Sequence, residues 1–182
     1  AIATQTDQKT IDELKTIYYE IKEGIGIHKN PAQYGAFPTD PYSHTPAHCG
    51  AQQPGMTGQV KEDYIARFGE LGVNVNNGCI SFKTNLLKHS EFITKRDEFN
   101  FYNIHGEKIT IPLEKNSMAF TYIQIPIIYT LSDKDQITIT LKNDERKTIN
   151  GSELKPDISR SIFNRTGEIT KIEVSIDHTL LN

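Results

Sequence analysis

The spacing of hydrophobic residues changes near residue 95, and this change constrains the fold more than any other feature. Before it, apolar residues recur every three to four positions, which is the spacing of one helix face. After it, apolar and polar residues alternate in short runs bounded by turn residues, as in half-buried strands. We therefore expect an α+β protein in which a two-helix, loop-rich segment over residues 1–94 precedes an antiparallel β-sandwich over residues 95–182.

Two helices are predicted in the first segment, over residues 7–23 and 58–71. The spacing of Thr10 and Glu13 matches a capping box and favours a helix start at Thr10. Each predicted helix has an apolar stripe along one face. We expect other parts of the chain or a second copy to cover both stripes, because the two helices alone cannot bury each other's stripe completely. The two stripes are Ile11, Leu14, Ile17, Tyr18 and Ile21, and Val60, Tyr64, Ile65, Phe68 and Leu71.

The turn Asn76-Asn77-Gly78 predicts a hairpin, because Asn and Gly tolerate the positive φ that such turns require. Pro126 interrupts a long apolar run, which indicates an edge position or a bulge there. In one strand, Ile137, Ile139 and Leu141 should face one side and the two intervening threonines the other. The strands predicted in the second half cover residues 99–104, 108–113, 118–131, 137–141, 147–149 and 169–176.

Charge and hydropathy exclude two kinds of partner. The chain holds 20 Lys and Arg against 23 Asp and Glu, spread evenly, so no basic face for nucleic acid is expected. No apolar run is long enough to cross a membrane. The small, polar residues 1–6 are typical of an exported chain, or of one trimmed at that end, and we expect a secreted or periplasmic protein. Cys49 and Cys79 could form a disulfide there or remain free thiols.

Residues 28–58 form the most unusual stretch of the chain, because five prolines exclude a long helix from it. Loops of this length in compact domains are usually functional or disordered. The aromatic residues Tyr34, Phe37 and Tyr42 favour an ordered loop, since they have something to bury. The five prolines are Pro31, Pro38, Pro41, Pro46 and Pro54.

The spacing of Asp40, His44 and His48 would align metal ligands on a helix, but the prolines break any helix here. No ligand set is complete, so we assign no metal and no cofactor. The alternative is that the histidines bond backbone carbonyls and hold the loop in shape.

Asp40 and Glu62 are the candidate catalytic carboxylates. Glycoside hydrolysis needs two carboxyl groups, about 5–10 Å apart, as acid and as base or nucleophile. Each also has a structural explanation, since Asp40 can cap a turn and Glu62 can stabilise a helix start.

The loop also combines flat aromatic rings with amides, a mixture typical of sugar sites. Packing of the aromatic rings in the core is the alternative explanation. The candidate ligand-binding residues are Tyr34, Tyr42, His44, His48 and Gln53.

The sequence over residues 34–46 and 50–62 resembles the late part of large bacterial carbohydrate-active proteins, the glycoside hydrolases and phosphorylases built on an (α/α)6 toroid. Residues 125–129, 161–163 and 167–169 are similar to the β-sandwich that follows such toroids. The resemblance implies a terminal piece of such an enzyme or a truncated relative, because a toroid needs many more helices than the two predicted here. Such a piece would carry a rim loop and an accessory sandwich without a complete catalytic cavity.

Three functions remain open. The first is a carbohydrate-active-enzyme-related module, catalytically incomplete on its own, that contacts carbohydrate as part of a larger enzyme or a homo-oligomer. The second is a small glycoside hydrolase or metal-assisted enzyme that uses the loop between Asp40 and Glu62. The third is a structural protein-interaction domain.

Overall fold

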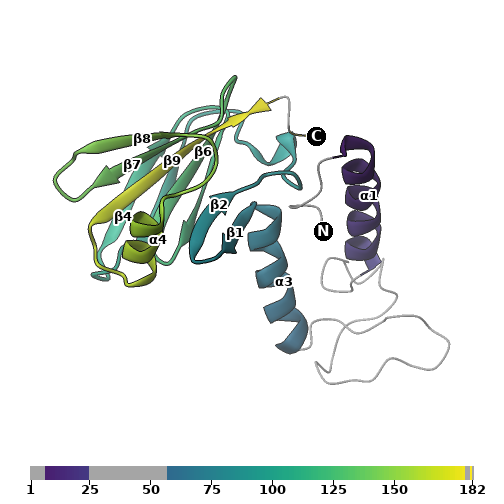
Figure 1. Cartoon of the computed structure of the whole chain (residues 1–182), viewed down its shortest axis with the longest axis horizontal. Coiled ribbons are helices and arrows are strands. Elements are labelled where there is room, and N and C mark those ends of the chain that lie inside the picture. The colour runs from purple at the N-terminus through teal and green to yellow at the C-terminus, as the bar shows by residue number, and fades with distance from the viewer. Residues whose placement is uncertain (1–6, 25–56, 179–180, 182) are drawn as a thin grey trace. The chain divides into compact units, whose positions relative to one another are not determined.

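The computed structural model describes residues 7–24, 57–178 and 181, and the chain divides into two units, Ala1–Gly69 and Glu70–Asn182 (Figure 1). The combination of helices with a strand-rich C-terminal part confirms the α+β class. None of the helices in the described residues is long and apolar enough to cross a membrane.

Both predicted helices of the first unit are present, as α1 (Gln8–Gly24) and α3 (Thr57–Glu70). The start of α1 differs from the predicted capping box. The carboxylate of Asp7 accepts the Thr10 N–H at 2.9 Å and also the Thr10 hydroxyl, so Asp7 is the N-cap. These hydrogen bonds from Thr10 lower the pKa of Asp7 below its ordinary value.

The apolar stripes of these helices are only partly covered. In α1, Ile11 is buried, whereas Ile17 is 51% exposed and Ile21 is 65% exposed. In α3, Tyr64 is 65% exposed and Ile65 is 70% exposed. Complete burial of the stripes is therefore not observed in the part of the chain that the structure describes.

The second unit contains a five-stranded sheet and two separate hairpins (Figure 1). The sheet order is β5-β6-β9-β7-β8, and β6 and β9 are its one parallel pair among the described strands. Its strands are β5 (Ser117–Tyr122), β6 (Ile125–Ser132), β7 (Gln136–Leu141), β8 (Arg146–Asn150) and β9 (Ile169–Asp177). The hairpins are β1 (Val73–Asn76) with β2 (Cys79–Phe82), and β3 (Asp97–Tyr102) with β4 (Lys108–Leu113). A short 3-10 helix, η3 (His89–Glu91), lies between the two hairpins in the sequence.

The position of β9 explains the parallel pair. The chain leaves β8, forms α4 (Pro156–Phe163) and enters the sheet between β6 and β7. Parallel neighbours need a crossover connection, and α4 lies within it (Figure 1). The sequence analysis did not predict this helix, which has only eight residues.

The apolar run over residues 118–131 is a hairpin of two strands, not the single long strand expected. Ile123 and Gln124 both have positive φ and form its turn. Pro126 is the second residue of β6, and the parallel ladder with β9 begins only at Ile127. The missing N–H of Pro126 therefore removes no ladder bond to β9.

The core lies on the sheet face toward α4. Tyr129 is fully buried there. The rings of Phe82 and Phe120 lie edge-on to its ring, with centroid distances of 6.0 and 5.2 Å. Its hydroxyl donates a hydrogen bond to the Leu71 carbonyl at 2.6 Å. Burial raises the pKa of Tyr129 well above its ordinary value. The predicted alternation is confirmed on the same face for Ile137 and Ile139, which are completely buried, whereas Leu141, after a register shift at Thr140, is half-buried.

The β1–β2 hairpin is joined to the segment before and within α4. The buried Ser159 hydroxyl accepts the Ile80 N–H at 3.0 Å. Two backbone bonds flank it, from Leu154 N–H to the Ile80 carbonyl at 2.9 Å and from Phe82 N–H to the Ser152 carbonyl at 2.8 Å. These bonds explain why the second unit begins at Glu70, whereas the sequence placed the division between residues 94 and 95.

Candidate functional site

The predicted loop site remains a prediction. Glu62 lies on α3, where the backbone is described but this side chain is not. Cys79 is a free, half-buried thiol, and Cys49 lies outside the described residues. The other predicted catalytic and ligand-binding residues also lie outside them: Asp40, Tyr34, Tyr42, His44, His48 and Gln53.

Within the described residues, β8 is the most accessible edge of the five-stranded sheet. It pairs only with β7, and four of its five residues are exposed. The hairpin bonds from Leu141 N–H to the Glu145 carbonyl (2.9 Å) and from Gly151 N–H to the Asp135 carbonyl (3.1 Å) bracket the β7–β8 ladder.

In an antiparallel ladder, hydrogen-bonded residue pairs alternate with pairs that are not hydrogen-bonded. The two bonds from Leu141 and Gly151 therefore determine which residues of β8 bond to β7. Lys147 and Ile149 bond to β7, whereas the N–H and C=O groups of Arg146, Thr148 and Asn150 point away from it. These outward groups have no backbone partner within the described chain. One side of β8 therefore offers unused main-chain hydrogen bonds.

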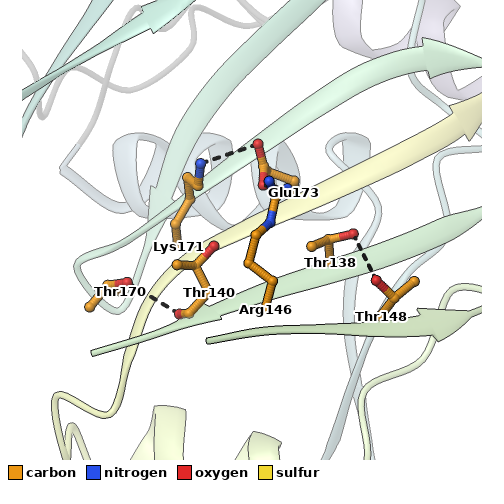
Figure 2. A network of polar contacts seen from close by, with 7 residues as sticks. All are labelled: Thr138, Thr140, Arg146, Thr148, Thr170, Lys171 and Glu173. Atoms are coloured by element: carbon orange, nitrogen blue, oxygen red, sulfur yellow. Dashed lines mark hydrogen bonds and ion pairs between the residues drawn. The ribbon is translucent and has the colours of Figure 1, made fainter. Parts of the chain in front are cut away.

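On the sheet face away from α4, Glu173 bridges two cations (Figure 2). Its Oε2 lies 2.7 Å from Nη2 of Arg146, and its Oε1 lies 3.2 Å from Nζ of Lys171. The Arg146 side chain is 60% exposed, so its remaining donors face solvent. Exposed ion pairs contribute only about 0–1 kcal/mol to stability, so a ligand can compete for the Arg146 contact at low cost. The Lys171–Glu173 pair is less exposed, with side chains 28% and 32% accessible.

Threonine hydroxyls extend this polar face beside the charged groups (Figure 2). The hydroxyls of Thr138 and Thr148 lie 3.5 Å apart across the β7–β8 pair. The Thr170 hydroxyl donates to the Thr140 carbonyl at 3.2 Å. The Thr140 hydroxyl is buried and has no hydrogen-bond partner in the structure described. Together the side chains of Thr138, Thr140, Arg146, Thr148, Thr170, Lys171 and Glu173 form what we call the polar face.

On the other side of the sheet, an open groove of about 590 Å³ runs between α4 and strands β7 and β8. No aromatic residue is among those that line it. Lys155, Asp157 and Glu168 on its rim have no ion-pair partner in the described part of the chain. Its floor is aliphatic and is formed by Ile139, Leu141, Ile149, Ile158 and Ile169.

A smaller cavity of about 100 Å³ lies where β2, β8 and β9 end and β7 begins. Asp135 lines it, but its Oδ1 already accepts the Asp177 N–H at 3.1 Å. This carboxylate therefore holds the end of β9 in place. No group of three or more His, Cys, Asp or Glu side chains in the described ranges is placed to hold a metal ion.

The sequence analysis missed both surfaces next to β8. The threonine alternation was visible in the sequence, but it was used only to assign register. The bridge through Glu173 was not visible, because residues 146, 171 and 173 meet only when β9 enters beside β7. A comparison with protein-family models gave no match, and neither did a comparison with curated proteins.

Proposed function

We propose that the chain is an accessory, catalytically incomplete module of a carbohydrate-active protein, and that its polar face contacts a glycan outside the cytoplasm. The observation that supports this proposal is the Glu173 bridge with its neighbouring hydroxyls on a partly exposed sheet surface. The resemblance of residues 34–46 and 50–62 to carbohydrate-active proteins is independent support for the proposal.

The chemistry of the polar face suits sugar hydroxyls. Each hydroxyl of a sugar donates and accepts at once, so it can bond a carboxylate and a cation that lie side by side. Hydrogen bonds to charged groups are about twice as strong as neutral ones. Because the ion pairs already hold Arg146 and Lys171 near Glu173, less ordering is needed when a glycan binds.

The affinity of this face should be low, because none of its members is aromatic. Rings that stack on sugar C–H surfaces would add apolar contact area, which the threonines supply only through their methyl groups. We expect a dissociation constant of about 1 mM for a short oligosaccharide, equivalent to about −4 kcal/mol.

Binding is tested by affinity electrophoresis in gels that contain different soluble polysaccharides. The full chain should be retarded by at least one of them, and Glu173→Gln should lose that retardation because it removes the charge that bridges the two cations. Arg165→Gln is the matched control, since Arg165 is exposed and lies outside the polar face. The same retardation in the Glu173 variant would overturn this role of the polar face.

Catalysis is tested separately with chromogenic glycosides, in the presence and absence of phosphate. The proposal predicts no turnover above that of Asp40→Asn and Glu62→Gln. Turnover that either substitution abolishes would establish the alternative, a small glycoside hydrolase that uses the predicted loop.

The groove favours a second candidate, a protein-interaction domain. Its aliphatic floor and mixed-charge rim suit an apolar polypeptide segment better than a sugar. Loss of a defined protein complex in Ile158→Asp, with glycan retardation unchanged, would assign this function to the groove. Unchanged complex formation in that variant would exclude the groove as the docking surface.

A further inference from the structure

We propose that two copies of this chain pair through β8, antiparallel and edge to edge, so that their two five-stranded sheets become one continuous sheet. The outward N–H and C=O groups of Arg146, Thr148 and Asn150 would form the new ladder. This inference does not depend on glycan binding, because it concerns the main-chain edge of the sheet.

The two edges of the sheet differ in how they are protected. At the β5 edge, Ile93 donates to the Ser117 carbonyl at 2.9 Å and accepts the Asn116 N–H at 2.9 Å. The β8 edge has no such cover among the described residues, and a free edge is a template for pairing with another strand. Ile93 covers only the first residue of β5, but none of the six residues of β5 is exposed, whereas four of the five residues of β8 are. The more open edge of this sheet is therefore β8.

The sequence of β8 favours one register. When Thr148 lies on the two-fold axis, it faces Thr148 of the second copy, Arg146 faces Asn150, and Lys147 faces Ile149. All five residues of β8 then have a partner in β8 of the second copy, and no like charges lie directly opposite each other. The three outward residues of each copy would form about six ladder hydrogen bonds.

The neighbouring registers are less favourable. Centring the pair on Lys147 places two ammonium groups directly opposite each other, which is destabilising. Centring it on Ile149 pairs fewer residues of β8 and brings Ser152 into the ladder, although its carbonyl already accepts the Phe82 N–H. Charge and strand length therefore select the pairing centred on Thr148.

Both sheet faces support this register. On the polar face, the Thr138–Thr148 hydroxyl pair would continue into the same pair of the second copy, because the two Thr148 side chains adjoin. On the other face, the half-buried Ile149 would lie against the methylene chain of Lys147 from the second copy. The two polar faces would then form one surface, and a long glycan could contact both copies at once.

The test uses the full chain in sedimentation-velocity experiments from low to high micromolar concentration. The wild-type chain should shift from monomer to dimer over this range. Thr148→Pro should remain monomeric, because it removes an outward N–H without removing a bond to β7. A wild-type chain that stays monomeric throughout, or a dimer that Thr148→Pro does not weaken, would overturn the proposal.

A matched pair of substitutions tests the register even if Thr148→Pro does not fold. Asn150→Arg places like charges opposite Arg146 twice in the dimer and should weaken it at least tenfold, whereas Asn150→Glu should retain or strengthen it. Amide exchange should also slow at Arg146, Thr148 and Asn150 as the concentration rises. Equal effects of the two Asn150 variants, or protection that appears on another element instead, would contradict the β8 pairing.

Discussion

At the scale of single residues, Tyr129 shows most clearly how one side chain connects distant parts of the second unit. It is fully buried, yet it carries a hydroxyl that must find a partner, and that partner is a backbone carbonyl outside the main sheet. Buried polar groups are expensive when they are left unpaired. The Tyr129 hydroxyl therefore ties the start of the second unit, at Leu71, to the centre of the sheet.

Replacing Tyr129 with Phe should lower the free energy of unfolding by about 1–3 kcal/mol, because the Leu71 carbonyl loses its partner in a buried place. Tyr102→Phe is the control, since Tyr102 is 62% exposed and should change stability by less than about 0.5 kcal/mol. Urea unfolding curves measure both. Equal effects of the two substitutions would show that the buried hydrogen bond contributes nothing.

Tyr129 also makes the free energy of unfolding depend on pH in the alkaline range. Burial raises the pKa of Tyr129 in the folded state, so the unfolded state loses this proton first as pH rises above about 10. The contribution of Tyr129 to stability is complete below pH 10 and is lost progressively above it. Subtracting the profile of Tyr129→Phe from that of wild type isolates this contribution. A difference that stays constant from pH 8 to pH 11 would contradict it.

At the scale of elements, local signals explain which predictions succeeded. The Asn77-Gly78 turn has φ values of 48° and 76°, as its sequence predicted. The eight residues of α4 offer too short a periodic pattern to be recognised. The hairpin turn at Ile123 and Gln124 uses positive φ at residues that rarely adopt it, so its sequence looked like continuous strand.

Gly72 should be the least replaceable glycine among those described. Its φ is 78°, and an added Cβ would lie 2.8 Å from the Thr84 nitrogen and closer still to the Lys83 carbonyl. Gly72→Ala should therefore cost more than the roughly 1–2 kcal/mol expected for a left-handed backbone alone. Gly78→Ala is the matched control, with a φ of 76° and nothing within 4 Å of the added atom. Similar thermal shifts for the two variants would refute the close approach at Gly72.

At the scale of the whole molecule, the pairing of strands that are distant in sequence determines features that local sequence patterns do not predict. The sheet order depends on β9 entering between β6 and β7, and neither the polar face nor the groove exists without it. The joining of the β1–β2 hairpin to Leu154 and Ser159 is equally non-local. For these reasons the strands were largely predictable, whereas the surfaces beside β8 and the start of the second unit were not.

A fragment of residues 70–182 should fold cooperatively, whereas a fragment of residues 95–182 should not. The shorter piece lacks Ile80 and Phe82, which are buried, and leaves the Ser159 hydroxyl and the Tyr129 hydroxyl without their partners. Circular dichroism during thermal unfolding measures cooperativity for both. Two fragments of equal stability would contradict the division at Glu70.

The account is tested most directly by amide chemical shifts of the ¹⁵N-labelled full chain during titration with the polysaccharide that retards it, cleaved to oligosaccharides. Progressive shifts should appear at Thr138, Thr148, Lys171 and Glu173 and should disappear in Glu173→Gln, while the groove residue Ile158 stays unchanged. Shifts confined to the groove, or none at the polar face up to high millimolar glycan, would contradict the account.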